Sequence, residues 1–351
     1  MRRVPTDEPS PDPRGFHVHT PSGGSDRPQA RAHRVTGHRN SSHPGHMDIE
    51  STIARVEHLA AGGPFSAERA GRFGVSADTL AACLRRGRLE RVTRGWYDVP
   101  RPGLSAVQRH ARLVSCLVAR CWGRAVASHQ SGLVLHGLPL AAVSLRVAHL
   151  THVGSGPPRR AQDHVVHRRP RGLAETPSGD RLAVEWCLLQ VGATYGARAA
   201  TVPGDAALRL GVATRESLDG ALKLHRGAPG SLPAAAAMAL LDGRSESPGE
   251  SLLRYDLTVL GYDVVPQQPV VVAGQRFRPD LVVRGTKVAA EFDGKTKYSD
   301  PSAFAHEKFR EEAMRDDGWL FVRFMWPDLG RLPDIDRRMQ TALRTWRAQA
   351  A

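Results

Sequence analysis

The chain has 351 residues, 41% of them hydrophobic and 24% charged, which is typical of a globular protein with two or three cores. Its 49 Lys and Arg residues exceed its 35 Asp and Glu residues, for a formal net charge of +14. No apolar run reaches the roughly 18 residues that a membrane span requires, and no signal-peptide core is visible. We therefore expect a cytoplasmic protein with a polyanionic partner, nucleic acid before a membrane surface, although a GC-rich genome also enriches a chain in Arg.

The four cysteines form no CxxC pair and no Cys/His zinc spacing; they are Cys83, Cys116, Cys121 and Cys187. This pattern predicts reduced thiols, no zinc and no organic cofactor.

Residues 1–46 are rich in Pro, Ser, Gly, His and Arg and show almost no aliphatic periodicity. Such a segment buries too little apolar surface to offset the entropy of ordering, so we predict a disordered basic tail. Order is expected to begin near Met47. A true start at Met47 and a functional tail are both compatible with this pattern.

Residues 47–103 are expected to form one domain. Ser66 and Ser76 are placed to cap two successive short helices, and Gly87 ends the second. Two short strands around a Thr-Arg-Gly turn follow, which completes the order of a winged helix-turn-helix. Arginines at the second helix and the wing are the candidate DNA-binding residues, namely Arg85, Arg86, Arg88 and Arg94. The alternative is a small helical lobe with a basic surface.

Residues 104–243 are expected to form a middle α/β domain and a linker. A helix is predicted over 106–121, and strands over "SLRVAHLTHV" and "DHVVHRRP". His129 and His136 lie seven residues apart, on one helical face, with no third ligand between them. We interpret them as packing or capping residues in preference to a metal or catalytic pair. The segment "PGSLPAAAAMALLDGRSESPGE" is predicted to be a linker with a short helix.

Residues 244–351 begin with a helix that Ser247 caps, with Pro248 in its first turn and Glu250 at the capping-box position. The strands "RFRPDLVVR" and "KVAAEFD" then read as one hairpin. Because side chains alternate along a strand, Glu291 and Asp293 share a face, and a suitable register would bring Asp280 opposite them.

Three carboxylates at such close range repel one another unless a positive charge lies among them. Mg²⁺ prefers oxygen ligands and would fill this role, orienting a water for attack on a phosphodiester. Lys295 or Lys297, just beyond the strand, would then steady the phosphate or lower the pKa of the attacking water. A charged surface hairpin without a metal is the alternative.

The order Glu250, Pro279-Asp280 and Glu291-Phe292-Asp293-Gly294 resembles the PD-(D/E)xK nuclease superfamily, and more narrowly its very-short-patch-repair (Vsr)-like branch, over about residues 245–347. The resemblance implies a restriction-endonuclease-like mixed sheet flanked by helices. It implies Asp280 and Glu291 as metal ligands, Asp293 as a further ligand and Glu250 as an accessory acid. The family pattern has a lysine where this chain has Asp293, so Lys295 and Lys308 are its candidate replacements.

The blocks "FSAERAGRFGVSADTLAACLRRGRLERVTRGWYDVP" and "AVASHQSGLVLHGLPL" resemble AbiEi-type antitoxins of type IV toxin–antitoxin systems, over about residues 50–170. That family joins a winged helix-turn-helix to a small α/β domain and represses its own operon. Its fusion to a nuclease-like end is typical of actinobacterial proteins. The expected fold class is therefore α/β (α+β) throughout.

Two functions follow as hypotheses. The first is a Mg²⁺-dependent DNA endonuclease that its front domain places on DNA. The second is a non-catalytic antitoxin-like repressor, bound to operon DNA or a cognate toxin, whose nuclease-like domain only binds. The residues leave DNA versus RNA, the target and the oligomeric state open, and they disfavour a membrane-bound scaffold because no basic amphipathic helix is present.

Overall fold

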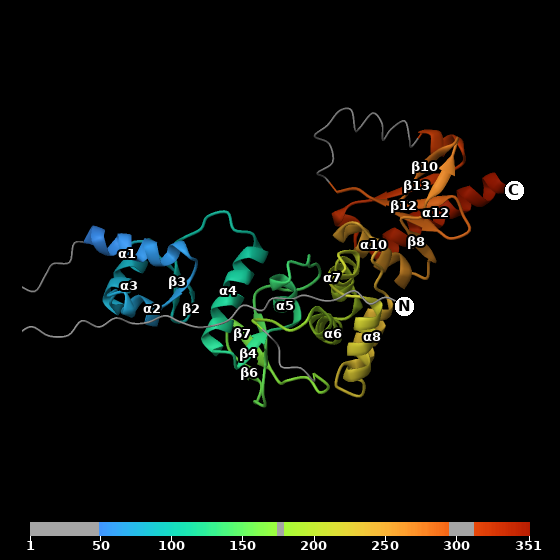
Figure 1. The fold of residues 1–351 in the computed structure, drawn as a ribbon. Coiled ribbons are helices and arrows are strands. Elements are labelled where there is room, and N and C mark those ends of the chain that lie inside the picture. Colours follow the sequence, from blue (N-terminus) through green and yellow to red (C-terminus); the bar gives the residue numbers. More distant parts are fainter. Residues whose placement is uncertain (1–48, 174–178, 295–311) are drawn as a thin grey trace, which may run out of the picture. The chain divides into compact units, whose positions relative to one another are not determined.

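The computed structural model describes residues 49–173, 179–294 and 312–351, and the predicted tail of residues 1–46 lies outside this set. The described chain is a mixed α/β structure with several helices and four sheets, as expected (Figure 1). None of the described helices combines the length and the apolar character needed to cross a bilayer.

The N-terminal part packs three helices against a small antiparallel sheet. Its elements in chain order are α1 (Ile49–Ala61), β1 (Phe65–Ser66), α2 (Ala67–Arg72), α3 (Ala77–Arg85), β2 (Glu90–Thr93) and β3 (Trp96–Asp98). The strand order is β1-β3-β2. A separate core holds this part together, built mainly on Val56, Leu59, Phe65 and Leu80.

The predicted helix starts and turns of this part are confirmed. Ser66 Oγ accepts a hydrogen bond from the backbone NH of Arg69 at 3.1 Å, and Ser76 Oγ accepts one from Thr79 at 3.2 Å. Gly95 takes a φ of +77° in the turn between β2 and β3, a conformation that favours glycine. Local side-chain chemistry therefore defines the boundaries of α2 and α3 and the turn.

A four-stranded sheet follows, in the order β4-β5-β7-β6, with β5 and β7 parallel. Its elements are α4 (Ala106–Cys121), β4 (Ala125–Ala127), α5 (His129–Leu135), β5 (Ala148–His152), β6 (Arg159–Arg160) and β7 (His164–His167). Val114 and Leu117 of α4 pack on Ala148 and Leu150 of the sheet.

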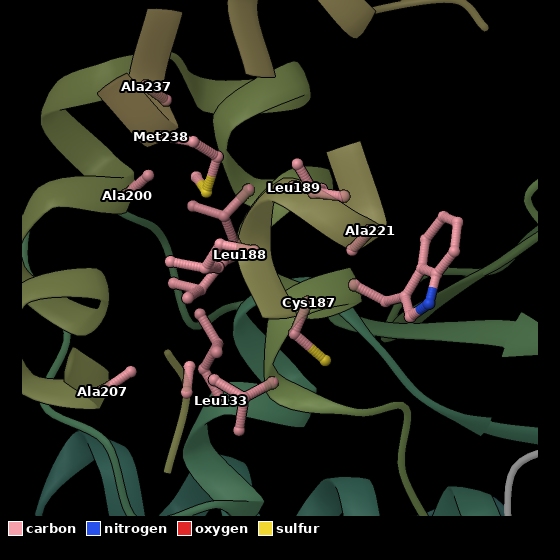
Figure 2. Close-up of a cluster of buried hydrophobic side chains, with 14 of the residues drawn as sticks. Leu133, Cys187, Leu188, Leu189, Ala200, Ala207, Ala221, Ala237 and Met238 are labelled. Atoms are coloured by element: carbon pink, nitrogen blue, oxygen red, sulfur yellow. The ribbon is translucent and has the colours of Figure 1, made fainter. Parts of the chain in front are cut away.

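The largest core lies among five helices, α5 and the four that follow the sheet: α6 (Val184–Tyr195), α7 (Ala197–Arg209), α8 (Arg215–His225) and α9 (Ser231–Ala239). Figure 2 shows side chains from all five helices meeting there, among them Leu133, Leu188, Ala207, Ala221 and Met238. The segment predicted as a linker with a short helix contains α9, and Ala234, Ala237 and Met238 of this helix are buried in the core.

The C-terminal part consists of α10 (Pro248–Val259), β8 (Val264–Pro266), β9 (Val270–Val272), β10 (Gln275–Phe277), β11 (Leu281–Val283), β12 (Val288–Phe292), β13 (Leu320–Phe324), the 3₁₀ turn η1 (Trp326–Asp328) and α12 (Leu332–Ala350). Its four-stranded sheet has the order β13-β12-β11-β8, with β13 parallel to β12. The strand predicted over "RFRPDLVVR" is two strands. β10 pairs with β9, and β11 pairs with β12. Pro279 and Asp280 lie between β10 and β11.

The two faces of this sheet carry different cores. Leu281, Ala290 and Phe292 face α10 and α12, where they pack with residues such as Leu253 and Met339. On the other face, a second cluster joins strand residues to the β9–β10 hairpin; it includes Val282, Ala289, Phe321, Val272, Phe277 and Trp319. The sheet is therefore the middle layer of this part of the chain.

Helix α10 reaches the end of β12 at a glycine. Ser247 caps the helix and Pro248 opens it, as predicted. A Cβ at Gly249 would overlap the ring of Phe292, so only glycine permits this approach. The contact places the first turn of α10, including Glu250, beside the end of β12.

Two ion pairs join α10 to α7. Arg254 donates from Nη2 to both carboxylate oxygens of Asp205, at 3.0 and 2.8 Å, and both side chains are buried. Arg198 pairs with the buried Asp256 at 3.1 Å. Asp205 also accepts a hydrogen bond from the backbone NH of Asp242. Each buried charge therefore has a counter-charge on the opposite helix.

We expect Asp205→Ala to lower the free energy of unfolding by about 3–5 kcal/mol, because it leaves Arg254 buried without its partner. Urea denaturation followed by circular dichroism measures this. Asp263→Ala is the matched control: it removes an exposed ion pair with Arg284 and should cost about 0–1 kcal/mol. Equal losses of unfolding free energy in the two variants would show that the buried Asp205–Arg254 pair stabilises the chain no more than an exposed ion pair does.

We expect Gly249→Ala to destabilise the chain by about 1–3 kcal/mol, because α10 must shift away from Phe292. Gly220→Ala is the control, since it lies inside α8 with open space around it and should stabilise by about 0.5–1 kcal/mol. Thermal unfolding compares the two. Equal stability of Gly249→Ala and the parent would contradict the close approach.

Candidate functional site

The acids at the end of the C-terminal sheet come together because of the register between β11 and β12. Leu281 pairs with Ala290 and Val282 with Ala289. One further step in this register places Asp280 opposite Glu291, on the face of the sheet that carries Ala289. Asp280 Oδ2 accepts a hydrogen bond from the backbone NH of Phe292 at 2.8 Å, which holds this carboxylate at the end of β12.

Glu250 joins this group through a glutamine. Gln267 Nε2 donates to Glu250 Oε2 at 3.1 Å and is 3.4 Å from Asp280 Oδ1. Glu250 is buried, and its carboxylate accepts from the backbone NH of Glu246 at 2.8 Å, in place of the capping-box bond predicted from the sequence. A neutral amide thus lies between two carboxylates whose charges repel.

Asp293 and Arg323 form the next part of the site. The parallel register pairs Glu291 with Arg323, so both side chains share the sheet face of Asp280. Arg323 Nη1 lies 3.6 Å from Asp293 Oδ2. The arginine therefore provides a positive charge at the position where the acids gather.

An aromatic side chain lies at the same end of the sheet. Trp326 of η1 is 50% exposed and contacts the ring of Phe292 edge to face, with ring centroids 5.1 Å apart. An exposed indole next to a cluster of acids offers a stacking surface to a base or another flat ligand.

The predicted lysines cannot be placed, because Lys295, Lys297 and Lys308 lie outside the described residues. Glu312 and Arg315 of the following segment are described, and both are exposed. Sequence reasoning missed Gln267 and Arg323. The single charge inside the apolar strand "LFVRF" was the available signal for Arg323.

These acids could hold a metal ion through carboxylate oxygens, with water or substrate completing its coordination. Among the residues that the structure describes, they do not bring three ligand atoms within 4.8 Å of one another. Mg²⁺ is commonly held by one or two carboxylates with water and substrate phosphate. Asp280 and Glu291 meet this requirement.

The four predicted DNA-binding arginines are all exposed: Arg85, Arg86, Arg88 and Arg94. Arg85 ends α3, Arg86 and Arg88 follow it, and Arg94 lies in the turn between β2 and β3. Within the described part of the chain, none of the four makes a side-chain hydrogen bond or ion pair. Their charges are therefore presented to solvent.

His129 and His136 do not act together. His136 Nε2 lies 2.8 Å from the carbonyl oxygen of Leu182, a structural contact of the kind we predicted. His129 instead lies beside His149 of β5 and His167 of β7, two histidines that sequence spacing did not connect with it. Burial lowers the pKa of all three, and mutual repulsion adds to this effect on His129 and His149; the pKa of His149 falls to about 4. All three imidazoles are therefore neutral at pH 7.

No protein-family model matches the chain. Two curated proteins of Mycobacterium tuberculosis are similar to it: the uncharacterized protein MT2308 of strain CDC 1551 and the uncharacterized protein Rv2248 of strain H37Rv. Each is 27% identical over 173 residues, which cover 48% of this chain and 64% of the relative. The chain thus spans less than two thirds of the length of these relatives.

Proposed function

We propose that the protein is a DNA-binding, Mg²⁺-dependent endonuclease whose catalytic centre is the acidic end of the β11–β12 pair. The observation that carries this proposal is the register that sets Asp280 opposite Glu291, with Glu250 tied to Asp280 through Gln267. This order of acids on a helix and two strands supports the resemblance to PD-(D/E)xK nucleases.

The N-terminal part is proposed to be a winged helix-turn-helix that carries the enzyme to DNA. Its element order supports this, because two short helices precede a two-stranded β-ribbon. Exposed arginines at the end of α3 and in the β2–β3 turn supply phosphate contacts of the sequence-independent kind.

Asp280 and Glu291 would hold the metal ion, and Mg²⁺ bound there would polarise the phosphate and lower the pKa of a water. Arg323 is positioned to stabilise negative charge on the phosphate, a role that a lysine fills in the family pattern. Asp293 orients Arg323 through their ion pair. Glu250 and Gln267 keep the carboxylate of Asp280 fixed, and Trp326 provides a surface for an unstacked base.

One observation favours a second function, that of a non-catalytic repressor. Asp293 occupies the lysine position of the family pattern and is paired with Arg323. A centre without that lysine would retain the fold as a DNA- or toxin-binding module. Footprinting on the DNA upstream of the protein's own gene, in EDTA, distinguishes this function because a repressor protects a defined site without nicking it.

We expect the full chain to nick supercoiled plasmid in Mg²⁺ or Mn²⁺ and not in EDTA. Asp280→Asn and Glu291→Gln should each slow nicking by more than about 100-fold, the scale on which loss of one electrostatic group affects a catalytic site. Asp263→Ala, which removes an exposed acid of the same region, should nick like the parent.

DNA binding by gel shift should remain unchanged in Asp280→Asn. Metal-independent nicking, or equal rates in the parent and both site variants, would assign the nicking to a contaminant and reject the catalytic centre. Specific binding with no nicking under any metal would select the repressor.

We expect Arg85→Ala/Arg94→Ala to weaken DNA binding and to reduce the slope of log K against log salt by about 2, because two phosphate contacts are lost. Arg209→Ala/Arg226→Ala is a control of equal charge, with exposed arginines at the ends of α7 and α8. An identical slope in Arg85→Ala/Arg94→Ala and the parent would show that these two arginines do not contact DNA.

A further inference from the structure

Three histidines from different elements meet in the middle part of the chain. His129 begins α5, His149 lies on β5 and His167 ends β7. The ring centroids of His129 and His167 are 4.1 Å apart, and those of His149 and His167 are 5.0 Å apart. One ligand atom from each residue can be chosen so that all three lie within 4.8 Å of one another, the only such group among the described His, Cys, Asp and Glu residues.

Two of the rings are held by hydroxyl groups on their outer nitrogens. Ser128 Oγ is 3.0 Å from His129 Nδ1, and Tyr195 Oη is 3.1 Å from His149 Nε2. Gln130 Nε2 in turn donates to Tyr195 Oη at 3.1 Å. Metal-binding histidines commonly have such a partner on the nitrogen that does not bind the metal, because it fixes the ring orientation.

The inner nitrogens are left facing one another. His149 Nδ1 lies 3.0 Å from His167 Nε2. Two imidazole nitrogens on one tetrahedral zinc ion, at 2.0–2.1 Å each, are separated by about 3.3 Å. The spacing of these two nitrogens is therefore within a few tenths of an ångström of the spacing in a zinc site.

The backbone around His129 is shaped to present this ring. His129 takes a φ of +52°, a left-handed conformation that is unusual for a residue other than glycine. Its NH is held by Gln190 Oε1 at 3.1 Å. Ser128, at the N-cap of α5, makes no side-chain capping bond, because its hydroxyl is directed to the ring of His129. The N-cap residue Ser128 therefore does not cap α5, and His129 has a strained backbone conformation.

We propose that His129, His149 and His167 form a tetrahedral metal site for Zn²⁺ or a similar borderline transition metal. Ligation is by His129 Nε2, His149 Nδ1 and His167 Nε2, and one position remains for water or another ligand. All three imidazoles are neutral, so no proton competes for their lone pairs at pH 7. His129 and His149 are buried, and His167 is half-buried.

This site lies outside the acidic centre and does not depend on nuclease activity. It departs from the prediction of a zinc-free protein, which rested on Cys/His spacing along the chain. His149 and His167 lie on adjacent parallel strands, where His149 pairs with Val165 and Thr151 with His167. The register of the two strands, and not their spacing in sequence, brings these histidines onto one face.

The test is metal content and cobalt spectroscopy on the full chain. The parent is stripped with a chelator, loaded with Zn²⁺ or Co²⁺ and dialysed. We expect the parent to retain about one more equivalent of zinc than His149→Gln or His167→Gln. Loading with Co²⁺ should give the intense visible bands of a tetrahedral ion in the parent and in neither His149→Gln nor His167→Gln. Zinc should also raise the melting temperature of the parent and leave that of His167→Gln unchanged.

His152→Gln is the matched control, since it lies on β5 with His149 but bonds the carbonyl oxygen of Pro157. Residues 1–46 contain six further histidines, which are identical in every variant, so the difference between variants isolates the three-histidine site. Because His167 is half-buried, circular dichroism is used to verify that the His167→Gln variant folds. Equal zinc content in the parent and His167→Gln, without tetrahedral Co²⁺ bands in the parent, would overturn the site and leave a metal-free imidazole stack.

Discussion

The arrangement of the C-terminal part depends on the two ion pairs between α7 and α10. Arg254 and Asp256 lie within two residues of each other on α10 and pair with Asp205 and Arg198 on α7, so the two pairs run in opposite directions. Buried charges without partners are strongly destabilising, which leaves α10 little freedom to slide or rotate. Glu250 lies one helical turn before Arg254. The constraint that fixes the interface therefore also fixes the helix end that carries the first acid of the proposed centre.

The acidic end of the sheet is stabilised by donors placed between the acids. Asp280 receives the backbone NH of Phe292, Gln267 lies between Asp280 and Glu250, and Arg323 lies beside Asp293. Each donor reduces the repulsion between carboxylates without removing their charge. A site organised in this way holds its acids near one another, which a hard divalent cation requires and a purely structural surface hairpin does not.

Features that depend on residues close in sequence, such as helix caps, were predicted correctly. Features that depend on contacts between residues distant in sequence were not predicted. The caps at Ser66, Ser76 and Ser247 are confirmed because the capping side chain bonds a backbone NH three residues on. The short helix α9 was predicted but its burial was not, because its alanines show no amphipathic pattern and their burial follows from α6 packing on them. Pro279 interrupts the strand that was predicted as continuous, since it supplies no backbone NH for pairing. Neither Gln267 nor His149 has a sequence neighbour that reveals its role.

The two proposed metal sites differ in a way that separates their chemistry. Carboxylate oxygens select hard ions such as Mg²⁺, and imidazole nitrogens select zinc and similar ions. The three histidines lack a carboxylate ligand; hydroxyl groups hold the rings of His129 and His149, which are both buried, an environment that favours permanent occupation. Asp280 and Glu291 at the acidic end are only half-buried. A metal that copurifies with the protein would therefore belong to the histidines, while a metal that must be supplied for nicking would belong to Asp280 and Glu291.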